Sequence, residues 1–555
     1  MRPTRSLPPT PMTAQRDDAG ASRGGTLAAL LLVALAWTLA ACPLGDAVPV
    51  ESAAQARAVG VARAMADGGD LVVPSYRGES RLKKGPLQSW AQAGAMAVSG
   101  TRGPEAAAWA SFVLGLLWAA TPWMLGRALS RPLAGLLGSL ALCSTRATTR
   151  WGWSPEHDVV FGGFVGLAWA FLARALSPSG RARDSVLAGL ATAAALLVRG
   201  PFALAFVGVA ALVESVRRRD DPGAGRIRWI PFALATLLPA AAWLALVAVR
   251  LGGVGAVFDE MRRQALGEGG AHARPFYFFL GVIPAWSLFW TIPALAAAAY
   301  RLRAGRPSRP SGSLGFAATI AVVGLLTLTV VPAKQDHYAV PLLPALFLLA
   351  GGWFEDVLER TGARGRSVAI AVALAMGAAV AVNRLHGARV TGFVSPSVAL
   401  VALSALALAV AAAVSPRIAG LSRSLALALV FAAALAGWGS QAERHRGLLA
   451  EDLRTVAPEV ERLAGTRTVL GFAPGDGEAF DALDAWLARP VARLRDATLV
   501  QNWIDAKRPF AIVVAEPNRA RLDPYGASLR EAGTASPPRA KDAKDRYVVL
   551  VRDVP

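Results

Sequence analysis

The sequence contains few of the residues that metal centres and disulfide frameworks require. It has 2 cysteines and 5 histidines among 555 residues, and no run of His and Cys has the spacing of a structural zinc site. Cys42 and Cys143 are interpreted as ordinary thiols of apolar segments, with a disulfide and a lipoprotein-type cleavage at Cys42 as open alternatives. The sequence identifies no metal ion or other cofactor. Glu156, His157 and Asp158 could contribute to a divalent cation site, although three consecutive side chains rarely converge on one centre.

Charged residues are scarce as well, and acidic ones are the scarcer kind. Charged residues make up 17% of the chain, whereas about a quarter is usual for a soluble protein. Lys and Arg number 58 against 38 Asp and Glu, which gives a net charge of +20. This charge could indicate nucleic-acid binding, but arginines between apolar segments usually set membrane topology, so we expect no nucleic-acid partner. A hydrophobic share of 54% and a mean hydropathy of +0.42 are instead typical of a membrane protein.

Long, nearly charge-free runs recur between residues 25 and 440 and predict a polytopic α-helical membrane protein with about 13 transmembrane helices. The third, fifth, sixth and tenth runs fall short of the ~20 residues that cross a bilayer. Short loops on one side of this topology carry more Lys and Arg than those on the other, which predicts a cytoplasmic N-terminus. The predicted spans are 25–41, 106–126, 133–144, 158–176, 185–198, 201–214, 230–250, 276–299, 313–331, 338–353, 367–383, 397–414 and 424–439.

Composition divides the chain into three parts. Residues 1–24 are rich in Pro, Arg and Thr and are expected to form a disordered cytoplasmic tail. Residues 25–440 form the predicted transmembrane domain, with a large outer loop at 44–105. Residues 441–555 are expected to form a small extracytoplasmic α/β domain. Its expected strands lie at 466–472, 509–515 and 547–553, and its helices near 449–464 and 478–488.

Polar side chains gather at the outer ends of the predicted spans. Charges at membrane depth are costly, so such residues point to function. Lys and Arg in an outward-facing cavity would bind a phosphate, and a carboxylate there would accept a proton. The four sites are Glu51 with Arg57, Arg81–Leu87 followed by Trp90, Glu156–Asp158, and Lys334–Tyr338.

Each of these sites also has a structural interpretation. Lys83 and Lys84 could contact anionic lipid headgroups. Asp158 could cap the fourth span, and His337 with Tyr338 could belong to the aromatic belt at the membrane surface. The occurrence of all four sites on one side of the predicted topology favours a functional cavity.

Short motifs follow one another in a fixed order along roughly residues 25–353. The motif residues are Arg57, Arg63, Met65, Gly69, Asp70, Val73, Pro74, Lys84, Pro86, Leu87, Trp90, Asp158, Arg199, Gly200, Pro201, His272, Pro275, Phe276, Tyr277, Pro284, Trp286, Lys334, His337, Tyr338, Pro341 and Pro344. No single motif is specific, but their order resembles the GT-C membrane glycosyltransferases. Within these, it is similar to the group of lipid A aminoarabinose transferases and protein O-mannosyltransferases.

Four residues depart from the pattern of that group. Ala54-Gln55 stands in place of an Asp-Glu pair, Lys83 in place of a Glu, and Gly85 in place of the first of two prolines. The Asp of the missing pair is the group's usual catalytic candidate. Glu51 lies three residues before Ala54 and shares a helix face with it. Either Glu51 replaces the missing acid, or the chemistry of this chain is altered or impaired.

The resemblance implies a multi-pass protein of the bacterial inner membrane with a periplasmic C-terminal domain. It implies transfer of a sugar from a polyprenyl-phosphate donor to a glycolipid, glycan or protein acceptor outside the cytoplasm, beside the membrane lipids. A catalytically impaired relative that binds a lipid-linked saccharide, or a membrane partner in envelope assembly, is the alternative that Ala54-Gln55 favours. The expected catalytic residues are Asp158 and Glu51, and the expected substrate-binding residues are Arg57, Lys84, Arg199, Lys334, His337 and Tyr338.

Overall fold

The computed structural model describes most of the chain. Residues 1–22 of the predicted tail and the predicted spans 367–383 and 397–414 lie outside the described residues. The described residues are 23–42, 50, 52–76, 79–82, 84–255, 257–259, 262, 274–287, 290, 314–356, 428–440, 453–472, 483, 485–487, 491–494, 496–536 and 546–553.

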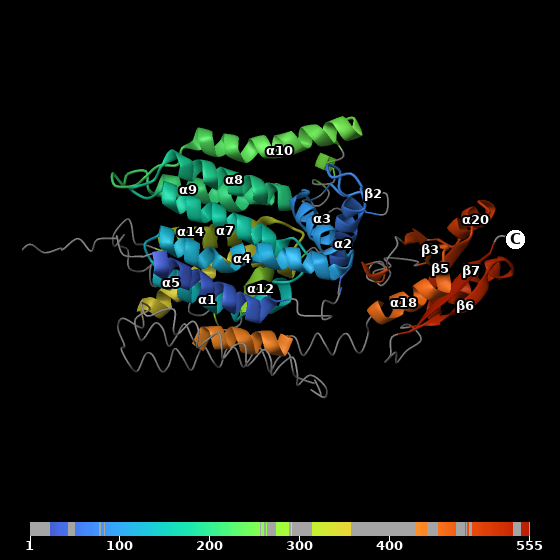
Figure 1. The fold of residues 1–555 in the computed structure, drawn as a ribbon. Coiled ribbons are helices and arrows are strands. Elements are labelled where there is room, and N and C mark those ends of the chain that lie inside the picture. The colour runs from blue at the N-terminus through green and yellow to red at the C-terminus, as the bar shows by residue number, and fades with distance from the viewer. Residues whose placement is uncertain are drawn as a thin grey trace, which may run out of the picture.

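Helices dominate up to residue 440, and a sheet follows them (Figure 1). The helices are α1 (Arg23–Ala41), α2 (Ala53–Ala66), α3 (Leu87–Ser99), α4 (Pro104–Ala128), α5 (Pro132–Cys143), α6 (Arg146–Trp151), α7 (Asp158–Ala175), α8 (Ala182–Arg199), the π-helix η1 (Leu204–Val209), α9 (Ala210–Arg217), α10 (Trp229–Leu251), α12 (Phe278–Ser287), α14 (Gly315–Val330), the 3₁₀ helix η3 (Asp336–Leu342), α18 (Leu453–Ala464), α20 (Thr498–Asp505) and η4 (Glu516–Ser528). The strands are β1 (Ser75–Tyr76), β2 (Glu79–Ser80), β3 (Thr468–Phe472), β4 (Ala492–Leu494), β5 (Phe510–Ala515), β6 (Arg530–Ala535) and β7 (Tyr547–Arg552).

Helix α7 lies at the centre of the bundle, where it packs against α4, α8 and η3. Small residues let these helices approach closely, which is how helices usually associate in a membrane. A side chain added at Gly163 or Gly166 of α7 would meet α4. A side chain at Gly162 would meet Trp118 and the backbone of Pro341. The α7 surface therefore fixes both α4 and the segment that carries η3.

The helix η3, which begins the apolar segment 338–353, is held by a specific contact from α4. Trp118 is fully buried, and its Nε1 donates a hydrogen bond to the carbonyl of Val340 over 2.9 Å. Val340 lies in η3, three residues after His337. This bond and the close approach at Gly162 place the beginning of η3 beside the N-terminal end of α7.

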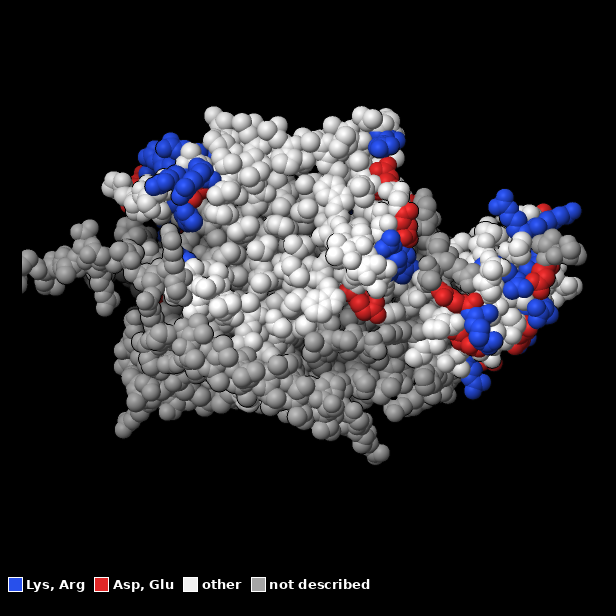
Figure 2. All heavy atoms as spheres, viewed as in Figure 1, with Lys and Arg blue, Asp and Glu red and all other residues white. Residues whose placement is uncertain are grey.

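The surface and the helix lengths both fit a membrane. Within the described part of the chain, four helical segments are long and apolar enough to span one: Pro104–Ala128, Asp158–Ala175, Trp229–Leu251 and Asp336–Asp356. On the face seen in Figure 2, a band of surface without Lys, Arg, Asp or Glu separates two charged ends. Each predicted span from 25 to 353, and the last one at 424–439, contains a helix of the described structure. The thiols of Cys42 and Cys143 are buried and are not bonded to each other.

The C-terminal residues form a five-stranded mixed sheet in the order β4-β3-β5-β7-β6. Strand β3 runs parallel to β4 and β5, and β7 runs antiparallel to β5 and β6. Alternate residues of the apolar strands pack toward α18 on one face and toward α20 and η4 on the other. Burial on both faces explains why these strands are continuous apolar runs. The three predicted strands are confirmed as β3, β5 and β7.

Two outer-loop helices, α2 and α3, pack on each other and on α4. Arg63 of α2 is buried and connects this loop to the C-terminal region. Its guanidinium donates to the carbonyls of Ala485 (2.6 Å) and Leu487 (2.8 Å), and its Nε donates to the carbonyl of Arg102 (3.1 Å). The planar guanidinium has five N–H donors in a fixed arrangement and can donate to three carbonyls at once. The sheet consequently lies next to α2 in Figure 1.

Candidate active site

The first residue of α7 is a buried acid that pairs with a base from the end of α8. Asp158 is 2% exposed and Arg199 is 7% exposed. Arg199 Nη1 forms an ion pair with Asp158 Oδ1. Asp158 also lies in the first turn of a helix, where the backbone N–H groups favour a negative charge. Helices α7 and α8 are joined by a short connection and pack side by side, so the acid and the base meet at the same end.

Two ring side chains of η3, Tyr338 and His337, lie next to this ion pair. The Arg199 guanidinium lies over the Tyr338 ring, with 4.4 Å from Cζ to the ring centroid. His337 Nε2 lies 3.8 Å from Asp158 Oδ2, and its Nδ1 lies 3.5 Å from Asp336 Oδ1. His337 therefore lies between a buried and a half-exposed carboxylate.

Lys84 reaches the same place from the outer loop. Its Nζ lies 3.3 Å from His157 Nδ1. Burial, together with the charges of Lys84 and Arg199, holds the pKa of His157 well below its usual value. The imidazole is therefore neutral near pH 7, and Nδ1 can accept a hydrogen bond from the ammonium group. Lys84 thus brings a cationic side chain to the end of the bundle where Asp158, Arg199 and His337 lie, which we call the mouth.

The loop that carries Lys84 is seated on α8 through Gly85. A Cβ at this position would overlap the backbone carbonyl of Leu197, so one of the two backbones would have to move. We expect Gly85→Ala to lower the stability of the protein by about 1–3 kcal/mol, as overpacking does. The thermal unfolding midpoint in detergent measures this effect.

Gly94→Ala is the matched control for that substitution. Gly94 lies within α3, and nothing is within 4 Å of a Cβ added there. Alanine is favoured over glycine in a helix, so the midpoint should stay unchanged or rise. Equal midpoints for the two variants would contradict the close seating of the loop on α8.

The loop before α7 brings a second acid, Glu156, to the N-terminal end of α2. Ser52 Oγ donates to Glu156 Oε1 over 3.0 Å. Gln88 Nε2 donates to the Glu156 carbonyl (2.9 Å) and the Pro155 carbonyl (2.8 Å), and Gln92 Nε2 donates to the Pro155 carbonyl (2.8 Å). Both glutamines are fully buried. Sequence reasoning missed this support, although two amides four residues apart on one helix face were the available signal.

Comparisons with known proteins agree with the helical membrane fold. Residues 83–246 match the family model described as dolichyl-phosphate-mannose-protein mannosyltransferase. The crystal structure of ArnT from Cupriavidus metallidurans bound to undecaprenyl phosphate superposes with a TM-score of 0.68 at 18% identity, and covers 95% of this chain and 97% of ArnT. The apo structure of the same ArnT gives 0.67 at 18% identity, with the same coverage. The chain has a GT-C membrane fold. No curated protein matches the chain significantly.

The GT-C resemblance predicted from the ordered motifs is confirmed by these comparisons. Its motif residues Lys84, Asp158, Arg199, His337 and Tyr338 come from four different segments and converge at one end of the bundle. The number of 13 spans, the domain boundaries and the membrane side of the C-terminal sheet stay predictions.

Two other predicted site residues have different surroundings, and a third lies outside the described residues. Arg57 is half-buried in the second turn of α2. Lys334 is buried, and its ammonium donates to the carbonyls of Val331 (2.6 Å) and Arg274 (3.4 Å), so it braces the turn before η3. Glu51, the predicted substitute for the missing acid, lies outside the described residues. The structure therefore leaves its role a prediction.

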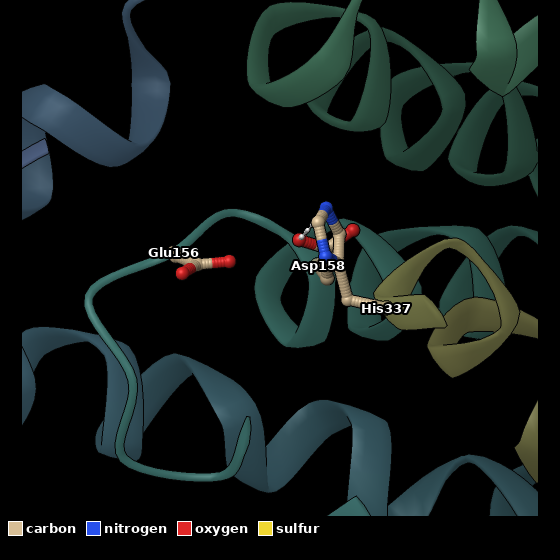
Figure 3. A group of neighbouring side chains, drawn as sticks. All are labelled: Glu156, Asp158 and His337. Carbon is tan, nitrogen blue, oxygen red and sulfur yellow. Dashed lines mark ion pairs between the residues drawn. The ribbon is translucent and has the colours of Figure 1, made fainter. Parts of the chain in front are cut away.

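One trio in the mouth of this GT-C fold has the composition of a cation site. Single ligand atoms of Glu156, Asp158 and His337 lie within 4.8 Å of one another (Figure 3). Arg199 already pairs with the Asp158 carboxylate and supplies the positive charge that a divalent cation would bring. A cation bound by all three residues would lie next to this buried guanidinium and be repelled by its charge, so the trio fits a resident metal poorly.

Proposed function

We propose that the chain is a glycosyltransferase that moves a sugar from a polyprenyl-phosphate donor to an extracytoplasmic acceptor. The observation that carries this proposal is the cluster of Lys84, Asp158, Arg199 and His337 at one mouth of an apolar helical bundle. A lipid-linked phosphate needs a cation close to apolar protein, and this mouth places Lys84 at one end of an apolar helical bundle. The GT-C fold, and the solved structure of a similar protein bound to undecaprenyl phosphate, support the same substrate class.

The proposed reaction is a displacement at the anomeric carbon of the donor sugar. The acceptor oxygen forms a bond to this carbon while the bond from the carbon to the phosphate oxygen breaks. The electron pair of that bond leaves with the polyprenyl phosphate, whose growing negative charge Lys84 stabilises, with Arg57 as a further predicted contact. The acceptor proton passes to a carboxylate of the mouth.

The apolar segment after Tyr338 is the proposed surface for the polyprenyl tail. All residues from Ala339 to Gly352 are buried within the bundle, so this segment can contact the tail only when the helices that cover it move apart. We place the protein in a bacterial inner membrane, with the mouth and the C-terminal domain on the periplasmic side. Acceptors consistent with this location are a glycolipid, a glycan or a protein.

Turnover by the purified protein in lipid nanodiscs tests this proposal. The substrates are undecaprenyl phosphates carrying a pentose or a hexose, and mass spectrometry follows the released undecaprenyl phosphate. We expect release above a protein-free control for at least one donor. Tight binding of undecaprenyl phosphate without any release would support the alternative, a non-catalytic relative, which the Ala54-Gln55 replacement favours. If the protein showed no binding of undecaprenyl phosphate and no release of it, both the transferase proposal and its alternative would be contradicted.

A further inference from the structure

The first turn of α2 lacks a carboxylate, and the structure places another carboxylate next to it. Ser52 precedes α2, and its Oγ accepts a hydrogen bond from the Gln55 N–H over 3.1 Å. The same hydroxyl donates to Glu156 Oε1 over 3.0 Å. Glu156 is 104 residues away in sequence, yet its carboxylate lies at the turn that holds Ala54 and Gln55.

A shared hydroxyl ties the two segments together a second time. Gln55 Nε2 donates to Ser154 Oγ over 3.2 Å, and this oxygen also accepts the N–H of Glu156 over 3.3 Å. Together with the bonds from Gln88 and Gln92 to the same loop, these bonds fix the backbone at Glu156 against α2 and α3. Such support is what a reactive side chain needs in order to be held in one position.

Glu156 and Asp158 differ in their charged partners. Asp158 is paired with Arg199, and its protonation would leave a buried guanidinium without its counter-charge. Glu156 forms no ion pair with any residue that the structure describes, and Ser52 bonds only to Oε1. Its Oε2 is therefore the carboxylate oxygen of this mouth that is best placed to accept a proton.

We infer that Glu156 is the catalytic base of this site, in place of the acid missing at Ala54-Gln55, and that the acceptor is a hydroxyl. This inference rests on the proposed transferase function. The acceptor O–H proton moves to Glu156 Oε2 as the acceptor oxygen bonds to the anomeric carbon. The polyprenyl phosphate then leaves with the electron pair of the broken bond. Asp158 acts as a positioning residue that holds Arg199 and His337.

The acceptor class follows from the need for a base. A hydroxyl must lose its proton during the attack, so a positioned carboxylate speeds the reaction. A phosphate monoester has a second pKa of about 6 and is already ionised at pH 7. It gains nothing from a base and would be repelled by Glu156 and Asp158.

Glu156→Gln and its rescue by Ala54→Asp test the inference. Donor turnover in nanodiscs is measured with n-octyl β-glucoside as the hydroxyl probe and octyl phosphate as the phosphate probe. We expect product on the glucoside only, a loss of about 100-fold in kcat for Glu156→Gln, and unchanged binding of undecaprenyl phosphate. In the double variant, Ala54→Asp should raise kcat at least about tenfold above that of Glu156→Gln alone, because it returns a carboxylate to the same turn.

The outcomes separate this inference from the proposed function. Full activity of Glu156→Gln in a protein that turns over donor would overturn Glu156 as the base and leave the transferase intact. Lost activity without rescue by Ala54→Asp, together with weaker undecaprenyl phosphate binding, would show a structural role and also overturn it. Product on octyl phosphate would overturn the acceptor class. An unmodified protein that neither binds undecaprenyl phosphate nor releases it from a donor would overturn the function itself.

Discussion

Arg199→Ala should lower the free energy of unfolding by about 3–5 kcal/mol, because it leaves the buried Asp158 carboxylate without its partner. This is a larger effect than the loss of an ordinary hydrogen bond, since a carboxylate that is 2% exposed cannot recover its hydration. The thermal unfolding midpoint in detergent reports the loss. Donor turnover should fall with it, since Arg199 also orders Tyr338.

The double variant Asp158→Asn with Arg199→Ala separates charge from packing. Neutralising both members of the pair removes the uncompensated charge, so we expect most of the stability to return while turnover stays low. Arg199→Lys should keep the ion pair in part but lose the planar contact with Tyr338. Equal midpoints for the single and the double variants would contradict the account of a buried ion pair.

Lys84→Ala should lower donor turnover by about 10²–10³-fold, the usual cost of removing one group that stabilises developing charge. The folded state should be little affected, since Lys84 is only half-buried and bonds to a neutral His157. Turnover and undecaprenyl phosphate affinity, measured on the same nanodisc preparation, check the prediction. Affinity for undecaprenyl phosphate should fall together with turnover, because this free monoester already carries the charge that develops on the donor phosphate as it leaves.

Arg250→Ala is the matched control for the removal of one positive charge. Arg250 is exposed near the end of α10, where its Nε lies 3.8 Å from Asp70 Oδ2. A loose pair at the surface contributes little, so turnover should not change. If both variants lost activity equally, general electrostatic attraction of the lipid phosphate would explain the effect, and Lys84 would not be a specific contact.

The fold was largely predictable because its signals are local. Apolar runs predicted the helices of the bundle, and continuous apolar strands predicted β3, β5 and β7. The π-helical turn at Leu204–Val209 was not predicted, since apolar residues alone do not distinguish a π-helical turn from an α-helical one. The docking of Arg63 onto backbone carbonyls more than 400 residues later carries no sequence signal at all.

The sequence predicted several of the residues that the structure brings together at the mouth, but not which of them pair with each other. A charge at membrane depth is costly, and this marked Asp158 and Lys84 from the sequence, whereas Arg199 was predicted from the order of the GT-C motifs. Which acid neutralises which base depends on tertiary packing, and Arg199 takes Asp158 while Lys84 lies beside His157. The hydrogen bonds that support Glu156 could not be predicted, because they come from buried serine and glutamine side chains. These residue types are usually exposed, and the sequence alone does not show which of them are buried.

A structure of the protein in nanodiscs with undecaprenyl phosphate, determined by electron cryomicroscopy, tests the central claim most directly. The claim is that segments distant in sequence build one phosphate site at the mouth formed by α7, α8, η3 and the loop of Lys84. We predict the phosphate within hydrogen-bonding distance of Lys84 Nζ, about 2.7–3.2 Å from a phosphate oxygen. A phosphate bound instead at the basic end of α9, among Arg217–Arg219, would contradict it.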